Sequence, residues 1–427
     1  MSRRRGDERG FLVRLTLPTL GLSLAVTLVT TYLPLTIRRY TDSATLIGFA
    51  IGGEGLFALA IPLIVGSVSD RTWNRWGRRR PFMIASAPLM AVAVALAPFQ
   101  PGYFQIAASV FVFFAAYHFY IAPYQALIPD LVPYSRHGQA QGFQTFMRGI
   151  GMFVAMVMAG LLLGEWEPLP YMLAGGLLLA LTAVAIVSIH EEPPIEPVSP
   201  RVGLRATVVE LWTSSRGEKP IHRLLVANYL WESTVQGLRP FIMLFFLYAL
   251  GVQARGGALL IGWVGLTYIL GGVVSGYLAD RYGRFRVMWG GIVVYMVGCV
   301  LGFFLRDIRW VVVLLPIFGA GGAAVLTLPY TIMMALMPAG RLGQFTGLYS
   351  FSRGLATVTA PLIVGAAIDI FARWLPESRG YGIIWLAAAA ALALSMVIFR
   401  TVPRPNEGDA VRTWRVDMPL EPPAGGV

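Results

Sequence analysis

Twelve long apolar stretches decide what this chain can fold into. A helix that crosses a bilayer needs about 20 mainly apolar residues in a row. The stretches are residues 11–37, 44–69, 81–100, 103–128, 142–164, 169–190, 222–250, 258–279, 286–305, 310–337, 343–369 and 380–400. Proline and glycine inside several stretches are compatible with spanning helices, because neighbouring helices can satisfy the backbone groups left free. The sequence therefore predicts an all-α membrane protein with 12 transmembrane helices.

The composition supports a membrane protein over a soluble one. Hydrophobic residues make up 56% of the chain and charged residues only 13%, whereas about a quarter of a typical soluble domain is charged. The basic N-terminus is followed by apolar sequence as far as Ile37. This stretch is longer than the apolar core of a signal peptide, so we expect an uncleaved first helix.

Basic residues predict the orientation in the membrane. With the N-terminus inside, the inner segments hold 22 arginines and lysines and the outer loops hold 7. Such an excess marks the cytoplasmic side, so we expect a multi-pass protein of the cell membrane with both termini cytoplasmic. The net charge of +12 is spread in clusters between apolar runs, not gathered in one patch. We therefore expect the lipid bilayer as the surrounding partner and no nucleic acid.

The two halves of the chain carry an internal repeat. The segment R-H-G-Q-A-Q-G-F-Q-T-F-M-R-G (136–149) matches R-L-G-Q-F-T-G-L-Y-S-F-S-R-G (341–354) at 7 of 14 positions. Parallel repeats of six helices form transporters with a site between the halves. We expect two pseudo-symmetric six-helix bundles, residues 1–190 and 222–402, joined by a cytoplasmic linker (191–221) and followed by a cytoplasmic tail (403–427).

The charge-rich segment between spans 2 and 3 carries a family resemblance. Its pattern, G-S-V-S-D-R-T-W-N-R-W-G-R-R-R (66–80), returns between spans 8 and 9 as G-Y-L-A-D-R-Y-G-R-F-R (276–286). With twelve spans in two halves, the chain resembles the major facilitator superfamily. The segments S-D-R to R-P-F (69–82) and P-Y-Q-A-L-I-P-D-L (123–131) are similar to the sucrose transporters and the glycoside–pentoside–hexuronide:cation symporters. This resemblance implies alternating-access transport of a sugar or glycoside with H⁺ or Na⁺.

The same resemblance implies a latch at the inner ends of the helices, which holds the outward-facing state. An aspartate at a helix C-terminus faces the negative end of the helix dipole and needs a cationic partner, and a glycine one turn earlier lets a second helix approach closely. The alternative is that these charges only set the orientation. The inner-gate candidates are Gly66, Asp70, Arg71, Arg78, Gly276, Asp280, Arg281 and Arg284.

Charged residues inside spans are costly and indicate function. In span 7 the residues Asn228, Glu232, Gln236 and Arg239 recur at helical spacing, which puts them on one face. We expect Glu232 to couple a cation, with Glu54 as a second acid. The alternative is that Glu232 forms an ion pair with Arg239 or Arg353 that only holds helices together, and for Glu54 a helix-packing hydrogen bond.

The remaining candidates are polar or aromatic groups that could bind a sugar. Aromatic faces stack on sugar rings, and guanidinium groups donate to hydroxyls or to a carboxylate. Each of these residues has an alternative role in helix packing or in binding loop carbonyls. The substrate-binding candidates are Tyr117, His118, Tyr120, Arg148, Asn228, Gln236, Arg239 and Arg353.

Other functional classes find little support. The four histidines show no metal or catalytic spacing, and there is no phosphate-binding glycine loop, so we expect neither an enzyme nor direct use of ATP. Cys299 is the only cysteine, which excludes an internal disulfide, and no cofactor or metal is expected. We expect a monomeric transporter. The alternative to sugar symport is a proton-coupled exporter of drugs or amphipathic metabolites.

The latch hypothesis predicts the phenotype of one substitution. Asp70→Asn should slow transport, because it removes the charge that re-forms the latch, while membrane insertion stays intact. Transport rate, normalised to the amount of inserted protein, measures this. Full transport activity in Asp70→Asn would refute the latch.

Overall fold

The computed structural model describes residues 2–69, 72–133, 136–189, 191, 219–336 and 342–403. The first half contains α1 (Ser2–Thr27), the π-helical turn η1 (Leu28–Tyr32), α2 (Leu33–Ile37), α3 (Ala44–Ser69), α4 (Arg80–Leu96), η2 (Ala97–Phe99), α5 (Tyr103–Leu131), α6 (His137–Leu162) and α7 (Pro168–Ser188). The second half contains α9 (Lys219–Leu238), α10 (Ile242–Ala249), α11 (Ala254–Tyr282), α12 (Arg284–Phe304), α13 (Ile308–Leu336), α14 (Leu342–Phe371), η4 (Pro376–Ser378) and α15 (Ile383–Phe399).

The helices match the predicted spans. Within the described part of the chain, 10 helices are long and apolar enough to cross a membrane, and α15 is a shorter apolar helix. The remaining span is divided into α9 and α10 around Pro240, because proline removes a backbone donor and clashes with the preceding turn. The polar residues of α9 also make that helix less apolar than the others. The all-α, twelve-span fold in two bundles is confirmed.

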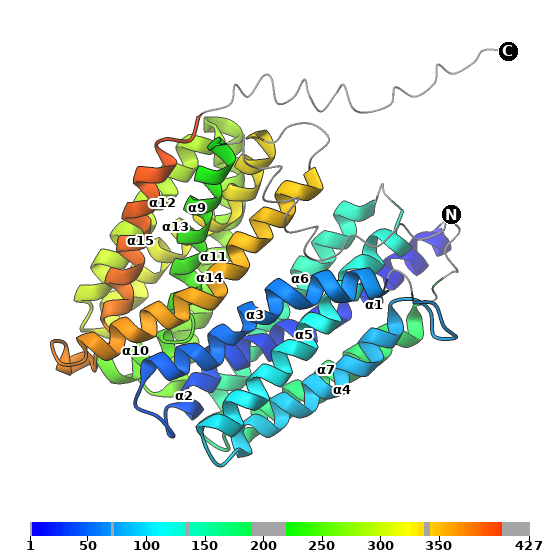
Figure 1. Ribbon diagram of the computed structural model, residues 1–427, viewed down its shortest axis with the longest axis horizontal. Coiled ribbons are helices and arrows are strands. Elements are labelled where there is room, and N and C mark those ends of the chain that lie inside the picture. The colour runs from blue at the N-terminus through cyan, green and yellow to red at the C-terminus, as the bar shows by residue number, and fades with distance from the viewer. Residues whose placement is uncertain are drawn as a thin grey trace.

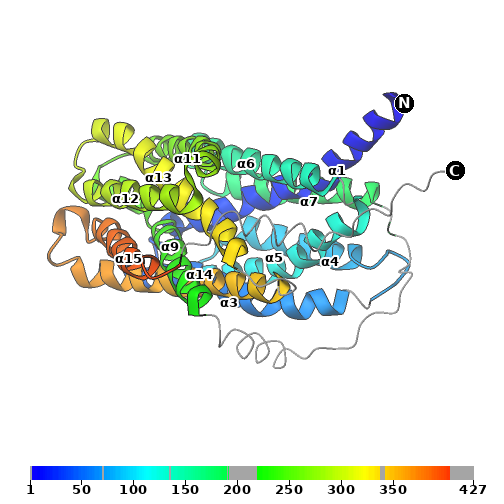
Figure 2. The ribbon, with the colours of Figure 1, turned by 90° about the horizontal axis from the view of Figure 1, so that it is seen from above.

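The two bundles lie side by side and meet along two pairs of helices. In the first bundle α1 packs on α6 and α7, and α4 packs on α5 and α7. In the second bundle α13 packs on α11 and α12, and α9 packs on α14 and α15. Most contacts between the bundles run from α3 to α14 and from α6 to α11, and smaller ones run from α10 to α2 and η1, as Figures 1 and 2 show for the two main pairs. Any movement between the halves must therefore act on these two pairs.

The two halves are in contact at one end and separated at the other (Figure 1). We call the end where α1 begins and α15 ends the terminal end, and the other the opposite end. Towards the opposite end, a Cβ at Gly48 of α3 would lie 2.2 Å from the carbonyl oxygen of Pro361, and one at Gly365 would lie 2.5 Å from that of Ala44. Towards the terminal end, a Cβ at Gly66 would meet nothing within 4 Å. Glycine thus allows backbone contact at one end only.

One carboxylate links the two halves at the opposite end. Asp369, near the end of α14, accepts hydrogen bonds from the backbone N–H groups of Ala44 (2.7 Å) and Thr45 (3.0 Å) at the start of α3. It also accepts from the hydroxyls of Ser43 (2.7 Å) and Thr45 (2.6 Å). The first N–H groups of a helix lack partners within it and attract negative charge. Asp369 therefore caps a helix of the other half.

A cation–aromatic stack lies at the same end. The guanidinium of Arg379 lies 4.4 Å from the ring centroid of Tyr248, and that of Arg38 lies 5.7 Å from it. Tyr248 in turn stacks on Tyr381, with ring centroids 5.7 Å apart. Arg38 belongs to the first half and the other three residues to the second. Together with Asp369, this stack closes the opposite end with polar contacts between the halves.

The Asp369 cap predicts a measurable opening. In Asp369→Asn one acceptor oxygen and the charge are lost, and a loss of about 1.4 kcal/mol shifts a two-state population tenfold. Spin labels at the exposed residues Tyr40 and Trp374, in a chain whose Cys299 is replaced by alanine, should report a larger population with long separations. Glu377→Gln is the control, because Glu377 pairs with Arg306 inside the second half. Unchanged distances in Asp369→Asn would contradict the role of the cap.

Candidate functional site

An ion pair between α9 and α14 lies deep in the second half. Arg353 Nε lies 3.2 Å from Glu232 Oε1. The Glu232 side chain is 8% exposed, whereas that of Arg353 is 60% exposed. This is one of the two pairs that the sequence offered as alternatives. It lets both groups remain charged in a span, where an unpaired charge costs about 2.5–3.5 kcal/mol.

A second acid, in the first half, lies within electrostatic range of arginines of the second half. Glu54 on α3 interacts electrostatically with Arg239, which follows α9, and with Arg353. Tyr117 on α5 lies within range of Glu54 and of the arginines at 148, 239 and 353. We call Glu54, Tyr117, Arg148, Glu232, Arg239 and Arg353 the central cluster. It joins groups from both halves, as a site between two bundles requires.

The polar face of α9 turns towards α14 and not towards lipid. Asn228 is 1% exposed, and its amide donates to Ser352 Oγ at 2.8 Å. One turn later Glu232 contacts Arg353. Gln236 is half-buried, and its side chain has no hydrogen bond to any residue in the described ranges. Asn228 and Glu232 thus both contact residues of α14.

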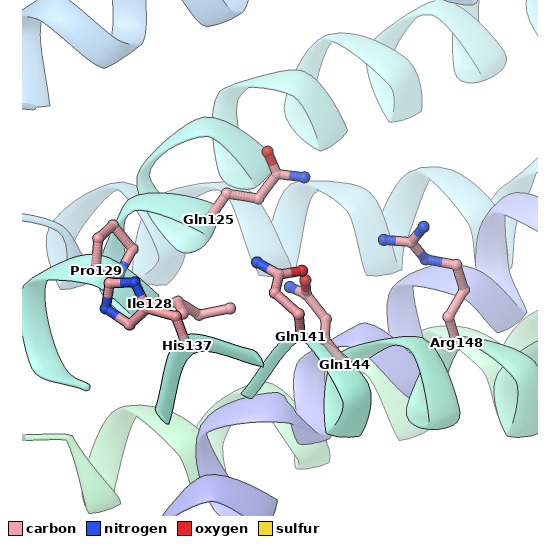
Figure 3. A pocket seen from close by; sticks show the side chains of 7 residues that line it. All are labelled: Gln125, Ile128, Pro129, His137, Gln141, Gln144 and Arg148. Atoms are coloured by element: carbon pink, nitrogen blue, oxygen red, sulfur yellow. The ribbon is translucent and has the colours of Figure 1, made fainter. Parts of the chain in front are cut away.

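A cavity of about 470 Å³ opens beside Arg148, between α5 and α6 (Figure 3). Gln141, Gln144 and Arg148 stand on one face of α6, because positions i, i+3 and i+7 are neighbours on a helix. Gln125 projects from α5 on the other side (Figure 3). His137 completes the polar lining, with its Nε2 2.8 Å from the carbonyl oxygen of Val132. Sequence reasoning missed the three glutamines, although two of them lie in the repeated segment.

The aromatic candidates of α5 separate into two groups. Tyr117 is half-buried and belongs to the central cluster. His118 is 7% exposed, and its ring stands edge-on to Tyr117 with centroids 4.9 Å apart. Tyr120 is fully buried, and its hydroxyl lies 3.3 Å from Thr182 Oγ1. Tyr120 therefore lies inside the first bundle and not among the residues that line the cavity.

The inner-gate residues of the first half form a different set of contacts from those expected. Asp70 and Arg71 lie outside the described residues. Arg78 and Arg79 both pair with Asp130, at the end of α5, over 2.6 and 3.1 Å. Glu191, after α7, accepts the backbone N–H groups of Arg78 and Arg79 at 2.8 Å and that of Arg80 at 3.0 Å. This loop is thus fixed to its own bundle by two carboxylates that the sequence did not single out.

The second half lacks this fixation among the described residues. Asp280 is exposed and has no ion pair there, while Arg281 lies over the ring of Tyr282 at 5.5 Å. Arg284 donates to the carbonyl oxygen of Thr331 at 3.3 Å. The close helix approach expected at Gly66 and Gly276 is not present, since a Cβ at either would meet nothing within 4 Å. The reason is the separation of the halves at this end.

Comparison with known families decides the class of this chain. Residues 15–265 and 234–422 each match the Major Facilitator Superfamily, so that the match covers both bundles. The chain belongs to the major facilitator superfamily.

Individual members of the superfamily are only distantly similar. An uncharacterized MFS-type transporter of Mycobacterium tuberculosis is 30% identical over 141 residues, which cover 31% of this chain and only 20% of that protein. A multi-drug resistance efflux pump PmrA homolog of Lactococcus lactis is 23% identical over 80% of this chain and 84% of its own length. The solved structure of a bacterial homolog of the human lysosomal transporter Spinster has a TM-score of 0.74 at 15% identity, over 97% of this chain and 99% of that one. The last likeness shows the shared fold alone.

The Asp130 contacts predict a stability difference between two aspartates. Asp130→Asn should lower the free energy of unfolding by about 1.5–3 kcal/mol, the usual contribution of a hydrogen bond to a charged group. The matched control is Asp280→Asn, which removes an aspartate that has no ion pair among the described residues and should leave stability unchanged. Thermal unfolding of the purified variants in one detergent measures both. Equal midpoints for the two variants would contradict the structural role of Asp130.

Proposed function

We propose that this chain is a secondary active transporter that moves a small polar solute by alternating access, coupled to protons. A sugar or glycoside taken up by symport is the first candidate. The observation that carries the proposal is the Glu232–Arg353 pair, because it places a titratable carboxylate in a cluster shared by both halves. A residue of this kind inside a span is a functional candidate by default.

Alternating access is supported by the uneven packing of the halves. Helices α3 and α14 touch backbone to backbone near the opposite end and leave Gly66 free near the terminal end. We propose that the protein spans the cell membrane with its terminal end on the cytoplasmic side, because the inner segments carry most of the arginines. In that orientation the structure corresponds to an inward-open state.

Proton coupling follows from the pairing of each central acid with an arginine. When Glu232 is protonated, Arg353 loses its counter-charge and becomes available to the solute or to Glu54. A sodium ion would instead need several oxygen ligands free of arginines. Within the described ranges, no group of three or more histidine, cysteine, aspartate or glutamate side chains comes together. We therefore favour H⁺ over Na⁺.

The cavity beside Arg148 supports a hydrophilic solute. Its lining combines three glutamines, one histidine and one arginine with only two apolar residues, Ile128 and Pro129. Amide and guanidinium groups supply both donors and acceptors, which suit hydroxyl groups. The volume of about 470 Å³ lies in the range of small-molecule sites, roughly 300–1,000 Å³.

A second candidate is proton-coupled export of drugs or amphipathic metabolites. It is favoured by the similarity to the Lactococcus lactis efflux pump homolog over 80% of the chain. The polar lining of the cavity argues for the first candidate. Sealed vesicles with an imposed pH gradient separate the two, since symport accumulates a sugar along the proton flow and export moves an amphipathic drug against it. A chain that moves neither class under any gradient is not a transporter of this kind.

Glu232→Gln tests the coupling. The amide cannot gain or lose a proton, so accumulation driven by a pH gradient should fall to the level without a gradient. Exchange of labelled for unlabelled solute across the membrane should persist, because the halves can still move. The control is Glu165→Gln, which changes an exposed glutamate outside the spans. If Glu232→Gln accumulates the solute at the wild-type level under a pH gradient, Glu232 does not couple protons to transport.

A further inference from the structure

The central cluster contains more positive than negative charge. Among its members, Glu232 pairs with Arg353, and Glu54 interacts electrostatically with Arg239. Arg148 is the remaining cation, and it makes neither a hydrogen bond nor an ion pair with any residue that the structure describes. A single positive charge is therefore left without a counter-charge in the middle of the protein.

Arg148 is placed to bind a ligand. Its side chain is exposed to the cavity, and Figure 3 shows its guanidinium reaching from α6 into the space below α5. The neighbouring polar groups are His137 and the neutral Gln125, Gln141 and Gln144, and no carboxylate belongs to the residues that line this cavity. A charged group is expensive inside a span, so an arginine kept there without an acid points to an anion that arrives from outside.

We propose that the transported solute carries one negative charge, as a carboxylate, which binds Arg148 while the glutamines bind its polar body. The proposal rests on the transport function above and names the class of its substrate. A carboxylate matches a guanidinium with two parallel hydrogen bonds. A phosphate monoester carries a charge of about −1.5 to −2 at neutral pH, which exceeds the single unpaired cation. One anion and one proton then cross together, so that the transport cycle moves no net charge.

Matched pairs of ligands test the charge directly. Each pair differs by one carboxylate: gluconate and glucitol, glucuronate and glucose, nicotinate and nicotinamide. At least one acid should raise the unfolding temperature of the purified protein at concentrations where its neutral partner does not. Arg148→Gln should weaken the apparent affinity for that acid by about tenfold or more, the loss expected for a hydrogen bond to a charged group. Arg309→Gln removes an exposed arginine outside the cavity and should change nothing.

Arg148→Lys keeps the positive charge but not the planar pair of donors, so it should retain part of the preference for the acid over its neutral partner. The same variant also shows whether the protein still folds with a substitution at position 148. In vesicles, uptake of the acid under a pH gradient should not respond to an imposed membrane potential. The proposal is overturned if no acid stabilises the protein more than its neutral partner, or if Arg148→Gln keeps the preference. Proton-driven uptake of a neutral solute would overturn it while leaving the transport function intact. If no solute is taken up under any gradient, the transport function itself fails.

Discussion

A charge inside a membrane span is costly unless a second charge, on the protein or on a ligand, balances it. The Glu232–Arg353 pair meets that requirement within one bundle, over 3.2 Å between α9 and α14. Glu54 meets it across the interface, where it interacts with Arg239 and Arg353. In the proposed mechanism, protonation or a ligand replaces one partner of such a pair and thereby changes the contacts of the other. Taking a charged pair out of water carries a desolvation cost that the attraction between the partners offsets only in part.

The two ends of the molecule are controlled by different chemistry. At the opposite end, close backbone packing at Gly48 and Gly365 is combined with the Asp369 cap, whose hydrogen bonds hold only while α14 stays against α3. At the terminal end, Asp130 and Glu191 fix the charged loop to its own bundle and make no bridge to the other half among the described residues. The halves can therefore separate there without breaking those contacts. Contacts within one bundle at the terminal end and polar contacts between the halves at the opposite end are compatible with the proposed movement of the halves as units.

Much of this structure could be predicted from the sequence, but its pairings could not. The spans were predictable because hydropathy reports a property of single stretches, and the repeat showed that the halves are alike. Spacing along α9 placed Asn228 and Glu232 on one face. The partner of Arg78 was not predictable, because Arg78 lies in the loop before α4 and Asp130 near the end of α5, and periodicity carries no information about which segments touch. The capping role of Asp369 was not predictable either, because it depends on the contact between α14 and α3, which the sequence does not reveal.

The repeat also explains why one arginine is left over. Arg148 and Arg353 occupy matching positions, 205 residues apart, and both project from a helix next to the central space. Arg353 meets Glu232 on α9, which belongs to the first span of its half. At offsets of 205 to 210 the first span of the other half presents residues 22–27, L-S-L-A-V-T, which include no acid. The first half thus repeats the base but not its acid. This difference between the halves supports the proposal that a ligand supplies the counter-charge of Arg148.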